Sequence, residues 1–158
     1  MYTIVLIAEK ALASDDVADV TSLHEGEDAV RFVVLMPAEP ERHRFITALD
    51  DVVFGRFREA AHEVEHGEAT EDARTALETT VAGLRAAGAE VHGHLAPRDP
   101  VKLLRECVAE HEADEVIVLT EPHWVEEAVH RDWASRARHE VGVPVLRLLP
   151  HGERPVRP

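Results

Sequence analysis

The amino-acid sequence predicts an α/β fold: a single domain with one open, twisted, five-stranded parallel sheet and helices on both faces. Short apolar runs rich in β-branched residues recur along the chain, as in strands that are covered on both sides. Amphipathic stretches with helical spacing separate these runs. Because crossovers between parallel strands are right-handed, this alternation predicts a sheet sandwiched between helices.

The N-terminal part of the chain begins the alternation. Residues 3–8 (TIVLIA) form a continuous apolar run, which predicts a central strand. Ser14 is expected to cap a helix that ends near Gly26. The second strand is predicted over residues 29–36, because Pro37 follows it directly.

Two amphipathic stretches separate the second strand from the third. Apolar residues from Phe45 to Val64 recur on one side of the first stretch, and Gly67 interrupts it. Thr70 is expected to cap the next helix, and Gly88 is expected to end it.

The third strand and its helix come next. Residues 89–95 (AEVHGHL) predict a strand. Asp99 and Pro100 are expected to open a helix that runs through His111, with aspartate as the cap and proline at the first helical position.

The last third of the chain predicts a β-α-β unit. Residues 116–119 and 143–149 are apolar runs typical of buried strands. Apolar residues between them recur at helical spacing: Val125, Ala128, Val129, Trp133 and Ala137. The loop after the first of these strands is where an open α/β sheet usually holds a ligand.

Length and composition favour one domain with few classes of partner. We expect the 158 residues to form a domain over 1–150, with a flexible, proline-rich tail over 151–158. The formal charge of −14 repels phosphate backbones and anionic membranes, so nucleic acid and membranes are not expected partners. Cys107, the single cysteine, excludes an internal disulfide. The opening apolar run is too short to span a membrane, so we expect a cytoplasmic protein.

A family resemblance rests on the alternation of elements and on two segments. Residues 87–120 look like a strand, a G-D-P-type helix start and an A-D-x-I-V-V strand, and residues 142–149 (GVPVLRLL) look like a C-P-V-L-V-V closing strand. In these features the sequence resembles the universal stress protein family of adenine-nucleotide-binding, Rossmann-like folds. The resemblance covers most of the chain apart from residues 40–68.

The resemblance also implies where a nucleotide would bind, and the chain departs from the family pattern there. Nucleotide-binding members follow the A-D-x-I-V-V strand with G-x-x-G, about nine residues and then G-S or G-T, because glycine lets the main-chain amides approach phosphates. None of the matching positions is glycine: they are Leu119 or Thr120, Pro122 or His123, and Arg131 with Asp132.

The replacements in this loop are unsuited to a chain of phosphates. Pro122 has no amide hydrogen to donate, and Glu121 and Asp132 carry the same charge as phosphate. We therefore expect no cofactor, with ATP or AMP as the alternative. Glu9 is a candidate for the family's acidic residue on the adenine and ribose side. The residues predicted to line the ligand site are Ala8, Glu9, Met36, Thr120, Glu121, His123, Arg131 and Asp132.

Two histidine pairs are weaker candidates for metal ligands. Residues 62–66 (HEVEH) match H-E-x-x-H, which on a helix sets His62 and His66 beside a general-base glutamate, as in zinc peptidases. Gly67 follows at once, so a solvated, acidic helix end is the preferred interpretation. His92 and His94 project to one face of their strand and either share a metal or are ordinary polar strand residues.

No arrangement of catalytic residues stands out. The favoured function is a non-enzymatic, universal-stress-like regulatory or binding protein that lacks the usual ATP phosphate loop and has a small-molecule ligand. We expect it to form a homodimer through its last strand. The alternatives are an adenine-nucleotide-binding stress protein and a small zinc-dependent hydrolase that uses His62, Glu63 and His66.

Overall fold

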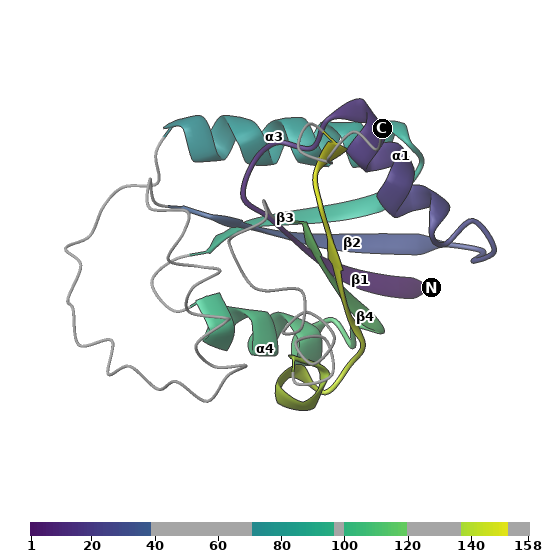
Figure 1. Cartoon of the computed structure of the whole chain (residues 1–158), viewed down its shortest axis with the longest axis vertical. Helices are drawn as coiled ribbons and strands as arrows, with labels where there is room; N and C mark the ends of the chain where they lie inside the picture. Colours follow the sequence, from purple (N-terminus) through teal and green to yellow (C-terminus); the bar gives the residue numbers. More distant parts are fainter. Residues whose placement is uncertain (39–70, 97–99, 120–136, 152–158) are drawn as a thin grey trace, which may run out of the picture.

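The computed structural model describes residues 1–38, 71–96, 100–119 and 137–151 of the chain. Five parallel strands form one sheet in the order β3-β2-β1-β4-β5. Helices α1 and α3 lie on one face of this sheet and α4 lies on the other (Figure 1). The predicted fold class, an open parallel sheet between two helical layers, is confirmed.

The described elements match the predicted ones in type and order. The strands are β1 (Tyr2–Ala8), β2 (Val30–Pro37), β3 (Glu90–Ala96), β4 (Glu115–Leu119) and β5 (Val145–Leu148). The helices are α1 (Ser14–Ser22), α3 (Glu71–Ala86) and α4 (Pro100–Glu110), and residues 137–141 are also helical. The helix predicted between Phe45 and Val64 lies outside the described residues, as do the predicted caps Thr70 and Asp99.

The start and the end of α1 differ from the prediction. Ala13, which has an extended backbone, is the N-cap residue, and Ser14 is already helical. The Asp16 side chain, at the third helical position, reaches back and accepts the Ala13 amide at 3.2 Å, whereas no side chain of the N-cap residue caps the helix. The helix ends at Ser22 instead of near Gly26, because residues 23–26 form turns.

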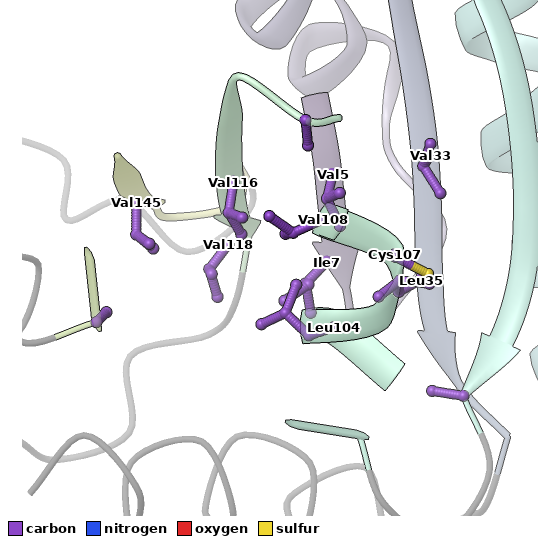
Figure 2. Close-up of a cluster of buried hydrophobic side chains, with 13 residues drawn as sticks. Val5, Ile7, Val33, Leu35, Leu104, Cys107, Val108, Val116, Val118 and Val145 are labelled. Carbon is purple, nitrogen blue, oxygen red and sulfur yellow. The ribbon is translucent and has the colours of Figure 1, made fainter. Parts of the chain in front are cut away.

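The core consists of two clusters, because alternate residues of each central strand face opposite sides of the sheet. On the α1 and α3 side, Ile4 and Leu6 of β1 pack with Phe32 of β2. On the α4 side, Figure 2 shows Val5, Ile7, Val33 and Leu35 against Leu104, Cys107 and Val108 of α4. This two-sided burial explains why the strands are continuous apolar runs.

All five strands are parallel, but the order in which they are added to the sheet reverses at its centre. After β1 the chain moves through β2 to β3 at one edge, and it then returns to β4 on the other side of β1. The helix that follows β1 and the helix that precedes β4 cover opposite faces. The carboxyl ends of β1 and β4 therefore lie between the helical layers that cover the two faces of the sheet (Figure 1).

Candidate functional site

The carboxyl ends of β1 and β4 meet where the sheet topology reverses. Ala8, the last residue of β1, lies in register with Leu119, the last residue of β4. In open α/β sheets, ligands usually bind in the crevice outside such a switch point. The sequence analysis predicted a ligand at these strand ends, and the described topology is suited to one.

Three of the predicted site residues belong to the described part of the chain. Ala8 and Met36 are each 1% exposed and pack in the cluster under α1 and α3. Their side chains are therefore core residues that support this edge of the sheet. Glu9 follows Ala8 directly and is also buried, with 5% exposure. The other predicted residues lie outside the described residues: Thr120, Glu121, His123, Arg131 and Asp132.

Glu9 is the polar residue that distinguishes this edge. Burying a carboxylate costs several kcal/mol unless hydrogen bonds or opposite charges compensate for the lost water. Buried carboxylates are rare at ordinary strand ends and more common at functional sites. Glu9 lies directly after β1, offset by one position from the acidic residue that the family resemblance implies on the ligand side.

The loop that carries Glu9 is held against α3. The Leu12 amide donates a hydrogen bond to Thr80 Oγ1 at 3.2 Å, and the Thr80 side chain is fully buried. Leu12 itself is buried in the core cluster, and Asp16 accepts the next amide in the loop, that of Ala13. Sequence analysis missed Thr80, because a threonine in an amphipathic helix carries no signal that it bonds to a loop 68 residues away.

The amino ends of the same strands hold a different polar group. His24 Nε2 lies 2.9 Å from Glu115 Oε2, and the Tyr2 ring stacks on the His24 ring with 4.7 Å between the centroids. Burial, and next the nearby Glu115 charge, raise the pKa of Tyr2 above its usual value. This group links the turn after α1 to the start of β4, at the edge of the sheet opposite Glu9.

The two predicted histidine pairs have different outcomes. His62 and His66 lie outside the described residues. His92 and His94 are on β3, and both approach the ring of His111, so the prediction that they share one face is confirmed. Within the described residues, no three potential ligands are already arranged around a metal position.

Glu90 lies beside this histidine pair. Its Oε1 is 3.2 Å from His92 Nε2 and 2.9 Å from Arg31 Nε. The hydrogen bond with His92, together with that from Arg31, holds the pKa of Glu90 below its usual value. Glu90 therefore stays ionised and acts as a hydrogen-bond acceptor for the His92 imidazole.

None of the described helices combines the length and the apolar character that a membrane span requires. No family model matches the sequence, and no curated protein is significantly similar to it.

Three solved structures of low sequence identity are similar to this chain, and one of them exceeds a TM-score of 0.5 and shares its fold. A universal stress protein family protein from Arabidopsis thaliana with AMP bound has a TM-score of 0.56 and 11% identity, over 99% of this chain and 97% of that chain. The universal stress protein from Archaeoglobus fulgidus has a TM-score of 0.47 and 17% identity, over 93% of both chains. Its complex with dAMP has a TM-score of 0.47 and 19% identity, over 93% of this chain and 96% of that chain.

Proposed function

We propose that this protein, which has the fold of the universal stress proteins, is a non-enzymatic regulatory protein that binds a small polar ligand at the carboxyl ends of β1 and β4. The observation that carries the proposal is the buried carboxylate of Glu9 at the switch point of the sheet. An ionised carboxylate accepts hydrogen bonds from hydroxyl and amino groups, and it repels phosphate. A role in the stress response and a cytoplasmic location belong to the same proposal.

The sequence after β4 supports a ligand without a chain of phosphates. Residues 120–124 (TEPHW) contain no glycine, and Pro122 has no amide hydrogen. Triphosphate loops rely on main-chain amides that approach the ligand closely, which glycine permits. With Glu9 on one side and Glu121 in the loop itself, the acidic residues further disfavour a triphosphate.

Equilibrium dialysis with ATP tests this proposal. We expect no saturable binding up to about 1 mM nucleotide, because neither the loop nor the local charge supports a triphosphate. Submicromolar binding of ATP would contradict the proposal. Glu9→Gln is the informative variant, since it replaces the carboxyl group with an amide of nearly the same shape, and Asp15→Asn on the exposed first turn of α1 is a matched control.

A nucleotide held mainly through its base and ribose is a second candidate. Two observations favour it: the Arabidopsis protein of the same fold contains AMP, and Glu9 directly follows β1, where the family resemblance implies an acidic residue on the ribose side. Native mass spectrometry of freshly purified protein distinguishes the candidates. A co-purified mass equal to that of AMP, lost in Glu9→Gln and retained in Asp15→Asn, would favour nucleotide binding.

We also propose a homodimer that pairs through β5. This strand forms one edge of the described sheet and has four residues, so a second copy could extend the sheet by twofold pairing. Light scattering coupled to size-exclusion chromatography should give twice the chain mass of 17.6 kDa. A monomeric mass at micromolar concentration would contradict the dimer and leave the ligand proposal intact.

A further inference from the structure

Three imidazoles, two from β3 and one from the turn after α4, come together at the β3 edge of the sheet. The ring of His111 lies 6.2 Å from that of His92 and 6.3 Å from that of His94, measured between centroids. The planes of His92 and His111 are inclined by 22°, and those of His94 and His111 by 45°. His92 and His94 are exposed and His111 is half-buried, so solvent ions can reach the cluster.

The fold itself directs these rings toward one another. In β3, Val91 packs on the α3 side, and Gly93 is so close to α3 that an added Cβ would lie 3.0 Å from Leu77 and Val81. The alternate residues His92 and His94 must then face the α4 side.

His111 reaches the same side from the end of α4. Its amide donates to the Cys107 carbonyl at 3.0 Å, which places it one helical turn after the buried Cys107. The next residue, Glu112, has a φ of 49°, and the Ala113 amide donates to the Val108 carbonyl, so His111 belongs to the turn that closes the helix. The backbone of His92 and His94 is therefore held by β3, and that of His111 by the hydrogen-bonded turn after α4.

From this geometry we propose that His92, His94 and His111 form a site for a divalent transition-metal cation, with Zn²⁺ as the representative ion. An imidazole nitrogen binds zinc at about 2.1 Å, so the centroids of two imidazoles on one tetrahedral ion lie about 5 Å apart. The observed separations of 6.2 and 6.3 Å are about 1 Å longer, so the rings have to turn toward a shared ion. Rotation of the side chains, without movement of the backbone, then brings the three nitrogens to one ion, and water supplies the fourth ligand.

The surroundings of the cluster favour a cation. Glu90 Oε1 lies 3.2 Å from His92 Nε2, the arrangement in which a carboxylate orients a metal-binding imidazole through its second nitrogen. His92 would then bind the ion through Nδ1. Glu106 and Glu110 on α4 are close enough to Cys107 to help raise the pKa of its thiol, so this end of the helix has a negative potential.

A bound ion would connect the edge strand to the C-terminal end of α4. Because no ligand set is preassembled within the described residues, the ion has to draw the rings together, and its binding energy stabilises the folded state. This site is separate from the crevice at Glu9. The crevice lies at the carboxyl ends of β1 and β4, whereas His111 lies between the end of α4 and the start of β4.

Calorimetric titration of the protein with zinc chloride tests the proposal. We expect binding at one site, weakened by about tenfold or more in His111→Gln, since the variant loses one of three ligands. His92→Gln and His94→Gln should have similar effects. His139→Gln, on the exposed surface of the last described helix, is the matched control and should leave the affinity unchanged.

A second pair of variants separates this site from the sequence motif at residues 62–66. Zinc affinity should persist in the double variant His62→Gln/His66→Gln, and zinc should raise the Tm of that variant as it does for the unmodified chain. Zinc binding of unchanged strength in the triple variant of His92, His94 and His111, or its loss in the His62 and His66 variant, would overturn the proposal. His92→Gln changes an exposed strand residue, so it tests the site even if His111→Gln impairs folding.

Discussion

The two faces of the sheet are supplied by the same strands but are packed differently. The α1 and α3 face holds large side chains, among them Phe32, Leu6 and Leu84. The α4 face is made mainly of valines and small residues, such as Val33 and Cys107 (Figure 2). A continuous apolar run therefore indicates burial on both faces, and the size of alternate residues differs according to the helix that each face receives.

The largest effect that tests this comparison comes from two neighbours in β2. Phe32 and Val33 are both fully buried and face opposite sides of the sheet. We expect Phe32→Ala to lower the free energy of unfolding by about 3–5 kcal/mol and Val33→Ala by about 1–3 kcal/mol, because the cavity left by phenylalanine is larger. Denaturant titration measures both. Equal losses would show that the two faces are packed alike.

A second pair of neighbours sharpens the comparison at the β3 edge. In Gly93→Ala the new Cβ would lie 3.0 Å from Leu77 Cδ1 and Val81 Cγ2, so overpacking should cost about 1–3 kcal/mol. His92→Ala, on the α4 side, should change stability by less than about 0.5 kcal/mol, since the residue is exposed. Thermal unfolding in the absence of metal ions measures both variants. A larger effect of His92→Ala would contradict the assignment of faces.

The loop that carries Glu9 gives a more local effect. Thr80→Val keeps the shape of the side chain and removes the acceptor of the Leu12 amide, which should cost about 1–3 kcal/mol. Hydrogen exchange at the Leu12 amide should become faster. Thr79→Val, at an exposed position on the same helix, is the control and should leave this exchange rate unchanged.

The smallest predicted effect concerns the thiol on the α4 face. Burial, and next the charges of Glu110 and Glu106, raise the pKa of Cys107 above the ordinary value of 9.0. Because the folded state holds this proton more tightly, its contribution to stability is fully present below pH 9 and is lost as the pH rises further.

Alkylation of the folded protein near pH 8 should accordingly be slow, and denaturant should accelerate it strongly. Iodoacetamide labelling followed by mass spectrometry measures the rate. Rapid labelling of the native protein would mean that the thiol is accessible on this face.

Much of the fold could be predicted from local pattern. The run of residues 3–8 lies within β1, and the spacing that ends at Gly88 matches α3, because apolar periodicity is a property of neighbouring residues. Gly88 indeed has a φ of 94°, which glycine adopts without strain. The predicted N-cap was wrong by one residue: the helix already includes Ser14, and the Asp16 carboxylate holds the amide of the preceding residue, Ala13.

The candidate site at the strand ends stays a prediction, and the structure describes three of its residues. The sequence analysis placed Glu9 at the end of a strand and expected a ligand there, and its burial agrees with a specialised role. Met36 was named for its place at a strand end, whereas its side chain packs in the core. The contact of Leu12 with Thr80 and the approach of His111 to His92 join residues that are far apart in the chain, so no local pattern indicates them.

By itself the amino-acid sequence determined the class of fold, the order of strands and helices along the chain, and the absence of glycine from the loop after the fourth strand. Each of these features depends only on residues that are neighbours in the chain. The tertiary structure decided the strand order, the helix that covers each face and the meeting of three histidines at one edge. The physical reason is that these features depend on which distant segments pack together, and the packing free energy is shared by the whole core.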